Sequence, residues 1–430
     1  MDTITPRAKA LSPQLTAWRR FLHRHAESGW TEYITTSFLA ETLTALGWEV
    51  RLGGEILKSS ARLGLPPKDV LAEAERRALS HGVPPERIAK MAGGRTGLLA
   101  VFRGAKNGRT VCLRFDIDAN DLTESDSPEH RPAQEGFASV HQGSMHACGH
   151  DGHMAIGLGI AALLAEHRDA LKGTVMLLFQ SAEEGVRGAD AFAKSGILDT
   201  VNELYGLHLG FALTASGTLG ASTEGFLATT KLDASFTGAP AHAGAQPDGG
   251  KNALLAAATA AIQLHALPRR KAGASRINVG TLHAGEGRNT IPARAELAAE
   301  VRGETTDICR AMTDDAMRVL TASAAMYDTD VDVRIAGKAY SLVFDEGLAR
   351  RTYDIASRLG IFEHVYERVT FGASEDFTVL ADRVKSCGGR ANYLILGTEL
   401  ASGHHTDRFD FDEEVLPLGT ALLTALVLAE

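Results

Sequence analysis

Short apolar runs alternate with longer segments of helical periodicity along the first half of the chain. Three runs have the pattern of buried strands, namely Thr110–Phe115, Thr174–Phe179 and Leu204–Leu209, and Ala155–Glu166 between the first two has the pattern of a helix. A strand, a helix and a second strand in this order predict a parallel pair joined by a right-handed crossover. The pattern therefore predicts an α/β fold built from layers of helix and sheet.

The region 228–336 has a different pattern, in which four strand-like segments surround two helical ones. In chain order these are Leu232–Thr237, the helix Asn252–His265, Arg276–Leu282, Ala293–Val301, the helix Ile308–Leu320 and Asp330–Ile335. The order βαββαβ is that of ferredoxin-like domains. We therefore predict an inserted domain at 228–336 within a larger, discontinuous domain of residues 1–227 and 337–430. A further helical excursion, with proline before each helical run, lies between Glu55 and Gly94.

Size and composition narrow the class of protein. A chain of 430 residues is longer than one ordinary core allows, which agrees with two domains. A net charge of −9 argues against a nucleic-acid partner, because phosphate binding needs a basic face. No apolar stretch approaches the roughly 20 residues of a membrane span, and no signal peptide is evident. The four cysteines form no C-x-x-C pair, which fits a reducing compartment, so we expect a cytoplasmic protein.

The densest cluster of chemically active side chains is HACGHDGH, from His146 to His153, directly before the predicted helix. Thiolate and imidazole are preferred ligands of zinc-like ions, and carboxylate also suits manganese. A polar loop with Cys148 as a small buried residue is the alternative interpretation. The density of ligand-type residues favours a metal site.

Carboxylates gather where the predicted strands end, which is where ligands bind in parallel sheets. Glu183 and Glu184 follow one strand in QSAEEG, and one of them could bind metal while its neighbour acts as general base. A charged helix N-terminus is the other interpretation. Asp116 and Asp118 follow another strand, and alternation along it predicts that only one of them faces the site.

Two further histidine positions gain meaning only beside these motifs. His208 ends a predicted strand, where a lone histidine is more often structural. His404 and His405 form a Gly-His-His turn near the C-terminus, which is either a source of one ligand or a surface loop.

Together the motifs resemble the amidohydrolase branch of the metal-dependent exopeptidases, which contains aminoacylases, indole-3-acetyl-amino-acid hydrolases and p-aminobenzoyl-glutamate hydrolases. The motifs that carry the resemblance run in family order over nearly the whole chain: RFDIDA (Arg114–Ala119), MHACGHDGH (Met145–His153), FQSAEEG (Phe179–Gly185), GLHLG (Gly206–Gly210), GAPAHAG (Gly238–Gly244), GRNTIP (Gly287–Pro292), FGASEDF (Phe371–Phe377) and GHHTDRFDFDE (Gly403–Glu413). The p-aminobenzoyl-glutamate hydrolase type is the most similar, because it has a comparable helical excursion and a stretch like HRPAQEGFASV (His130–Val140). The resemblance implies a mixed sheet flanked by helices, as in zinc exopeptidases, and an inserted lid or dimerisation domain.

The resemblance also implies roles for single residues. The metal ligands would be Cys148, His150, Glu184, His208 and His405, holding two divalent ions in each protomer, either Mn²⁺ or Zn²⁺. His405 has the family's spacing before Phe409, and His404 is the competing assignment. Glu183 matches the general base, and Asp118 matches an aspartate that orients a ligand or the base.

The inserted domain would contribute the remaining site residues. His242 matches a histidine that reaches the site of the partner protomer and stabilises the oxyanion, while Asn289 and Arg302 resemble substrate-binding residues. The implied assembly is a homodimer or larger homo-oligomer, and a requirement for a second, different type of chain is left open.

The implied reaction is hydrolysis of the amide bond of an N-acyl or N-aroyl amino acid, with a p-aminobenzoyl-glutamate-like substrate favoured. Ser181 stands where the family usually has proline, and Asn120 and Asp121 replace a common Leu-Pro pair, so the substrate is less certain than the mechanism. Three alternatives stay open: another conjugate such as indole-3-acetyl-aspartate, hydrolytic deamination of an aromatic amine as in 5-nitroanthranilate aminohydrolase, and a non-catalytic metal-storing protein. Retention of Glu183 argues against storage, because storage needs ligands but no adjacent base.

Overall fold

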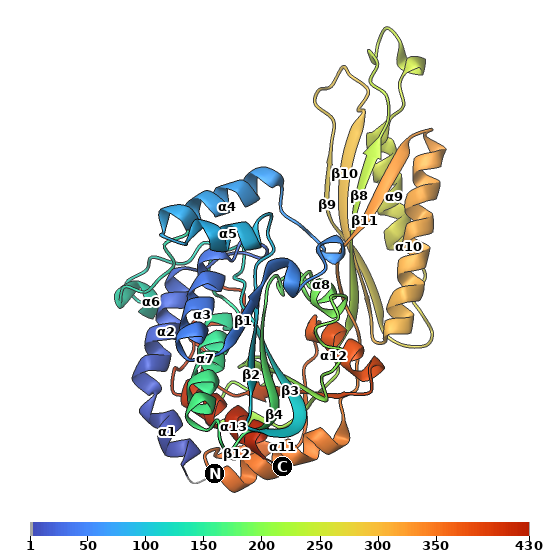
Figure 1. Ribbon diagram of the computed structural model, residues 1–430. Helices are drawn as coiled ribbons and strands as arrows, with labels where there is room; N and C mark the ends of the chain where they lie inside the picture. The colour runs from blue at the N-terminus through green and yellow to red at the C-terminus, as the bar shows by residue number, and fades with distance from the viewer. Residues whose placement is uncertain (1–2, 430) are drawn as a thin grey trace. The chain divides into compact units, whose positions relative to one another are not determined.

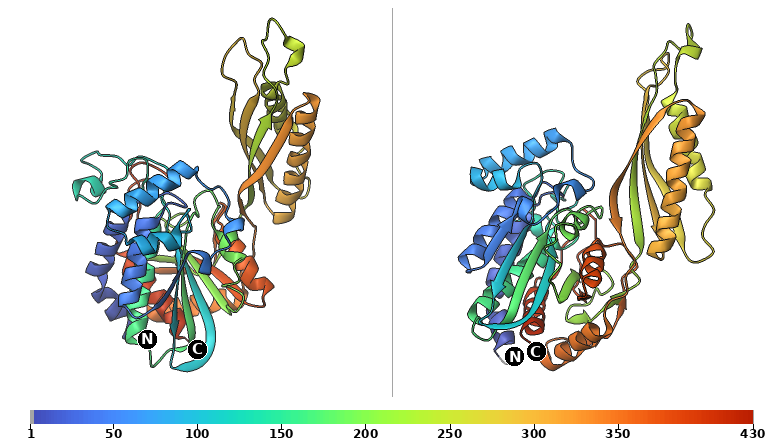
Figure 2. Two further views of the ribbon diagram at one scale, coloured as in Figure 1. Left: turned by 45° about the horizontal axis from the view of Figure 1, so that its top comes forward. Right: turned by 45° about the vertical axis from the view of Figure 1, so that its right-hand side comes forward.

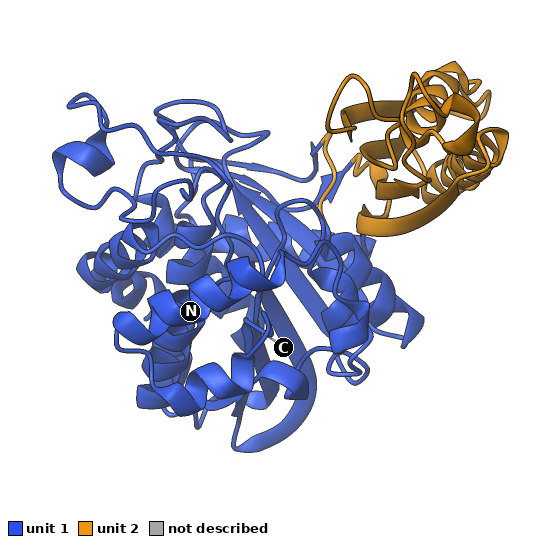
Figure 3. Cartoon of the chain, turned by 90° about the horizontal axis from the view of Figure 1, so that it is seen from above, with its two compact units in different colours: residues 1–224, 343–371, 376–430 blue, residues 225–342, 372–375 orange. Residues whose placement is uncertain are grey.

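The computed structural model describes residues 3–429, which form two compact units (Figure 3). Unit 1 comprises Met1–Glu224, Val343–Phe371 and Asp376–Glu430. Unit 2 comprises Gly225–Leu342 and Gly372–Glu375, and contains the region in which the sequence predicts an inserted domain.

Unit 1 is built around an eight-stranded mixed sheet, which agrees with the expected α/β class. Its spatial order is β1 (Glu49–Leu52), β2 (Leu98–Arg103), β4 (Lys172–Gln180), β3 (Lys106–Asp116), β5 (Glu203–Leu209), β14 (Arg390–Leu396), β6 (Thr218–Gly220) and β12 (His364–Tyr366). The neighbours β4, β3, β5 and β14 are parallel, whereas β1, β2 and β6 pair antiparallel to their neighbours. A separate two-stranded sheet joins β7 (Thr223–Glu224) to β13 (Val369–Thr370).

Helices cover both faces of this sheet (Figure 1). One face carries α2 (Ser12–Arg24), α3 (Tyr33–Ala45) and α7 (His150–Glu166), with α1 (Ile4–Ala10) and α13 (Val415–Leu428) packed on them. The other carries α8 (Ala189–Ala193) and α12 (Phe377–Ser386), and α11 (Glu346–Leu359) packs along β14 and β12. The connection from β3 through α7 to β4 confirms the predicted strand–helix–strand unit.

The helical excursion predicted between Glu55 and Gly94 forms a pair of helices. They are α4 (Lys68–Ser80) and α5 (Pro85–Met91), and Figure 2 shows them beside α3. Proline precedes or opens each helix, where its fixed φ suits the first turn and its missing N–H costs nothing. Short 3-10 turns Gly53–Glu55 and Ser59–Ala61 lead into the pair, and α6 (Arg131–Gln134) lies in the later loop before α7.

Unit 2 is a four-stranded antiparallel sheet with two helices packed on it. The strand order is β11 (Asp330–Ala339), β8 (Ala228–Thr237), β10 (Arg294–Gly303) and β9 (Ser275–Ala284), and the helices are α9 (Ala253–Ala266) and α10 (Thr306–Met326). Side chains cap both helices: Asn252 accepts from the Leu255 N–H, and Thr305 accepts from the Ile308 N–H. The element order is the βαββαβ expected from the sequence. Its function as a lid or dimerisation domain stays a prediction.

Candidate metal centre and active site

The candidate site lies where β3, β4 and β5 end, because parallel strands bring their carboxyl ends to one edge of the sheet. Gly149, with φ of 85°, is the residue before α7, and this left-handed conformation lets the chain turn sharply between Cys148 and His150. Glu183 and Glu184 follow β4 directly, and His208 lies within β5. Four segments that are distant in sequence therefore meet here, the fourth being the loop of His404 and His405.

Cys148 is shared by two groups of potential metal ligands. In one, its thiol lies with His208 and His404, and the Sγ to His208 Nε2 distance is 3.4 Å. In the other, it lies with Glu184 and His405, and the ligand atoms of each group are within 4.8 Å of one another. Cys148 is 6% exposed and His208 3%, so the centre is shielded from water. A thiolate between two such groups is suited to bridging two ions.

His150 has the hydrogen bonding expected of a metal-binding imidazole. Its Nδ1 donates to the main-chain carbonyl of Asp118 at 2.7 Å, which leaves the lone pair of Nε2 free. That Nε2 is buried and has no hydrogen-bond partner, and neither has Oε1 of Glu184. Orphaned buried acceptors of this kind need a cation or a proton, and His150 groups with Glu183 and Glu184 as potential ligands.

Asp116 and Asp118 both approach His150, which corrects the expectation that only one of them faces the site. Oδ1 of Asp116 is 3.8 Å from His150 Nε2, and Oδ1 of Asp118 is 3.7 Å from Nδ1. The reason is that β3 ends at Asp116, so strand alternation no longer applies at Asp118. Asp116 also accepts a 2.6 Å hydrogen bond from Nδ1 of His153.

The carboxylate of Asp118 fixes the main chain of the two glutamates. Its Oδ1 accepts from the Glu183 N–H and its Oδ2 from the Glu184 N–H, each at 2.9 Å. The preceding Ala182 has φ of 56°, an uncommon conformation for a residue with a Cβ. Asp118 is fully buried, so this clamp orients Glu183 and Glu184 without reaching solvent.

The electrostatics favour positive charge at the centre. Hydrogen bonds to Cys148 and Glu184 raise the pKa of His405 to about 10. Burial alone would raise the pKa of Glu184, but His405 and His150 outweigh it and lower that pKa to about 2. Burial likewise lowers the pKa of His150, but the Asp116 carboxylate reverses this and holds it well above the usual range. The donors therefore fit a divalent cation both in chemistry and in charge.

The three predicted residues of unit 2 do not gather at one place. His242 and Asn289 are neighbours, because the Ala243 N–H donates to the Asn289 carbonyl at 3.0 Å, and both side chains are exposed. Nδ1 of His242 accepts from two main-chain N–H groups of its own loop, which leaves Nε2 facing outward. Arg302 lies at the far end of β10 and pairs with Glu300, roughly 25 Å along the strand from the end nearest Asn289 at ~3.3 Å per residue.

Two networks of buried charge adjoin the centre and were missed by sequence reasoning. Arg114 in β3 donates to Asp116 at 2.6 Å and to Gln180 and Asp376 at 2.9 Å. Asp376 also accepts from two main-chain N–H groups before α8. A charged residue inside the apolar run TVCLRF was the one available signal, because only a paired arginine is buried in such a strand.

The second network contains Arg19, whose side chain is fully buried. It donates to Asp151 at 2.7 Å and to Asp410 at 2.7 Å, so it joins the HACGHDGH loop to the segment after His405. His23 lies between Asp151 and Glu124 at 2.8 and 2.9 Å. Burial would lower the pKa of His23, but these two carboxylates raise it to about 9.

The fold and site define a metal-dependent hydrolase of the exopeptidase type, and comparison with known proteins agrees. Residues 112–429 match Peptidase family M20/M25/M40, and the chain belongs to this family. Within residues 3–429, no helix is long and apolar enough to cross a membrane.

Individual relatives narrow the family further. The chain is 45% identical over 429 residues to the indole-3-acetyl-aspartic acid hydrolase of Enterobacter agglomerans, covering 99% of this chain and 98% of that protein. It is 42% identical to one of the polypeptides of the p-aminobenzoyl-glutamate hydrolase of Escherichia coli K12, covering 100% of this chain and 98% of that polypeptide. The crystal structure of the aminobenzoyl-glutamate utilization protein of Klebsiella pneumoniae has a TM-score of 0.86 at 36% identity, over 99% of this chain and 98% of that chain. A Bacillus subtilis dinuclear metal-binding peptidase of the same family shares the fold, with a TM-score of 0.65 at 24% identity over 98% of each chain.

Proposed function

We propose that this protein hydrolyses the amide bond of an N-acyl or N-aroyl amino acid, with a p-aminobenzoyl-glutamate-like substrate favoured. The observation that carries the proposal is the clamp of Asp118 on two adjacent glutamates. One of them, Glu184, faces Cys148 and His405, which leaves Glu183 beside the centre as a proton acceptor. The names of the relatives at 42–45% identity support the substrate class.

The proposed ligands are Cys148, His150, Glu184, His208 and His405, holding two divalent ions in each protomer, Mn²⁺ or Zn²⁺. Their sharing of Cys148 and the dinuclear relative support two ions rather than one. When bound, such ions lower the pKa of water and polarise a carbonyl.

The chain's own residues carry the proton. Glu183, 9% exposed, accepts a proton from water as the water oxygen attacks the carbonyl carbon. The C–N bond then breaks, and Glu183 returns that proton to the leaving nitrogen, so the products are a carboxylic acid and a free amino acid. Asp118 acts as a positioning residue, since it bonds only to the main chain of Glu183 and Glu184.

Between the adjacent histidines, we propose His405 as the last ligand. His405 has φ of 60°, so the two rings leave the chain in different directions. Nε2 of His405 lies 3.3 Å from Oε1 of Glu184, whereas Nε2 of His404 donates to the Leu209 carbonyl at 3.2 Å. His405→Ala should lower Mn²⁺ affinity in equilibrium dialysis while His404→Ala retains it. The reverse order would assign the site to His404.

We propose a homodimer in which His242 acts in the site of the partner protomer, stabilising the oxyanion, with Asn289 and Arg302 binding substrate. The outward Nε2 of His242 in an exposed loop supports this role. Co-expression of His242→Ala with Glu183→Ala should restore activity that neither variant has, because one site per mixed dimer is intact. Inactive mixed dimers of folded, metal-loaded parents would refute the shared site. The free thiol state of all four cysteines supports a cytoplasmic location as part of this proposal.

The decisive experiment is a substrate panel with detection of both amino acid and ammonia. Release of glutamate from p-aminobenzoyl-glutamate supports the proposal, and release of aspartate from indole-3-acetyl-aspartate supports the second candidate, which the 45% identical relative favours. Free ammonia from an aromatic amine would replace both by deamination. Glu183→Ala should keep its metal and lose roughly 100- to 10,000-fold in turnover. Loss of metal with activity would show that the two glutamates have exchanged roles.

A further inference from the structure

A cavity of about 670 Å³ lies in unit 1 between α4 and the loops that lead to the candidate metal centre. Ser144 lines it directly before the MHACGHDGH motif, and Asp121 lines it directly after RFDIDAN. Arg187 lines it as well and donates from Nε to the Glu184 carbonyl at 2.7 Å. The cavity therefore adjoins the residues proposed to bind metal, and its size is that of a small-molecule pocket, typically about 300–1,000 Å³.

Arg187 is a partly buried cation that is held by the main chain. Its Nε and Nη1 are bound by the carbonyls of Glu184 and Gly64, at 2.7 and 3.3 Å. No carboxylate within residues 3–429 pairs with it. Gly29 lines the same cavity, and any side chain there would collide with Nη2 of Arg187. The guanidinium is thus fixed at two donors and presents Nη2 beside the cavity.

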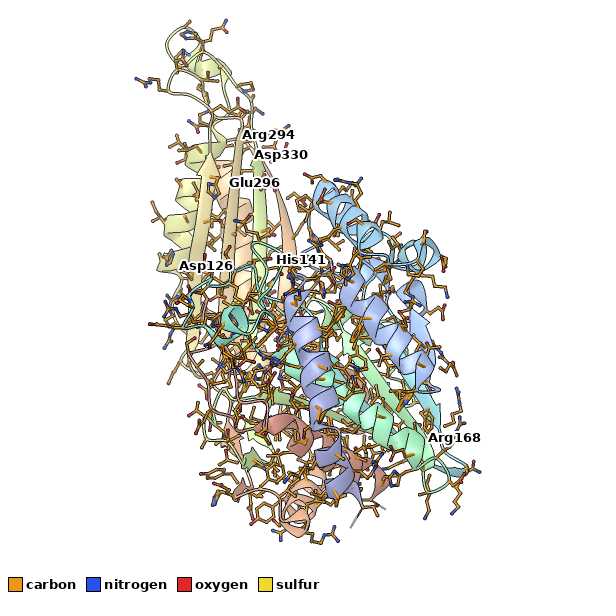
Figure 4. The ribbon with its side chains drawn as sticks, turned by 90° about the vertical axis from the view of Figure 1, so that its left-hand side faces the viewer. Asp126, His141, Arg168, Arg294, Glu296 and Asp330 are labelled. Carbon is orange, nitrogen blue, oxygen red and sulfur yellow. The ribbon has the colours of Figure 1, made fainter. Side chains whose placement is uncertain are left out.

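Arg77 on α4 adds a second cation to the wall. In the described part of the chain its one carboxylate contact is Glu27 at 3.4 Å, and its Nε is buried without a hydrogen-bond partner. The neighbouring His141, labelled in Figure 4, bonds through Nδ1 to the Ala26 carbonyl, and burial lowers its pKa, so it adds no charge at neutral pH.

The acidic residues of the same cavity do not cancel this charge. Asp69, Glu73 and Asp121 are all exposed, whereas Arg187 and Arg77 are partly buried. Glu73 pairs with Arg76, whose side chain is 68% exposed. Charges in water are screened far more strongly than those in a cavity, so the interior of the pocket stays cationic.

We propose that Arg187, supported by Arg77, binds the side-chain carboxylate of the substrate and selects conjugates of dicarboxylic amino acids. The inference rests on the proposed function and adds a specificity-determining residue to it. Planar guanidinium donors recognise a carboxylate with two parallel hydrogen bonds, which an amide of equal size cannot accept. Rejection of the uncharged analogue follows, because it would leave the guanidinium desolvated and unpaired.

The test compares p-aminobenzoyl-L-glutamate with p-aminobenzoyl-L-glutamine, which have the same shape and differ by one charge. The wild type should prefer the glutamate conjugate in kcat/KM by about 10- to 100-fold, the range of one lost charge-assisted contact. Arg187→Gln should abolish the preference, and Arg187→Lys should keep part of it. Arg76→Gln is the matched control, because it removes an exposed, paired charge from the same cavity and should leave the preference unchanged.

Each outcome separates the two proposals. Equal rates for both conjugates in the wild type would refute the pocket and leave the amide hydrolase intact. Hydrolysis of neither would refute the function, and calorimetric binding of glutarate to wild type but not to Arg187→Gln would then still support the pocket, whereas no binding would overturn it. If Arg187→Gln fails to fold, the wild-type ratio and Arg77→Gln, which should also reduce the preference, decide the question.

Discussion

Replacement of Arg19 by methionine should destabilise unit 1 strongly, because it removes the one cation shared by two buried carboxylates. The guanidinium is 0% exposed and lies 2.7 Å from both Asp151 and Asp410. Methionine fills much of the same space but leaves these carboxylates without their partner. Breaking a buried pair in this way typically costs about 3–5 kcal/mol.

Arg20 supplies the matched control, since it is the next residue on α2 and also pairs with Glu413 at 2.7 Å. Its side chain is 30% exposed, and pairs of that kind contribute about 0–1 kcal/mol. In calorimetry with chelator present, Arg19→Met should lower Tm by on the order of 5–10 °C, at about 2 °C per kcal/mol for a large domain. Arg20→Met should lower it by about 2 °C or less.

The pH dependence checks the cause of the effect. Burial would raise the pKa of Asp151, but Arg19 and His23 hold it well below its usual range. The stabilisation is therefore complete above the unfolded pKa of about 4 and is lost as the pH falls below it. The Tm difference between wild type and Arg19→Met should accordingly stay constant above about pH 5 and shrink below it. Equal Tm losses for the two arginine variants, or a difference that grows in acid, would refute the reasoning.

Three single sites can be tested separately. Bound Mn²⁺ should protect Cys148 from alkylation and chelation should expose it, while the exposed Cys387 reacts in both states; equal labelling of Cys148 would rule out ligation. Burial and two neighbouring histidines lower the pKa of His25 to about 4, so its neutral form stabilises the fold above about pH 6.5, and stability is lost as the pH falls toward 4. His25→Leu should therefore flatten Tm between pH 6.5 and 4.5. Gly157→Ala would place Cβ 2.8 Å from a phenylalanine of the sheet and should cost about 1–3 kcal/mol in urea unfolding, whereas Gly54→Ala, with open space around it, should cost less.

Elements with a strong local pattern were predictable from the sequence. The runs that became β3, β4 and β5 are apolar because both faces of the sheet are covered by helices, so burial alone identified them. In unit 2 the alternating runs matched strands with one face against α9 and α10. By contrast, β6 and β12 have three residues each, which is too short for a period to be recognised.

The polar environment of the site was not predictable in the same way. Asp118 was expected from the strand pattern to alternate with Asp116, but the strand ends first, and this depends on contacts rather than on local sequence. Arg19 meets residues 132 and 391 positions away in the chain. Because composition and periodicity are local properties, only the folded structure identifies such partners.

These buried networks explain how ligands from four segments keep their positions. Arg19 joins the segments of Asp151 and Asp410, which follow the proposed ligands His150 and His405. Asp118 in turn fixes the main chain of Glu183 and Glu184. Since none of these contacts is made by a ligand atom, removal of a ligand should cost metal affinity while the fold persists. Removal of Arg19 should reduce both stability and metal affinity, because the loops that carry His150 and His405 would then be free to separate.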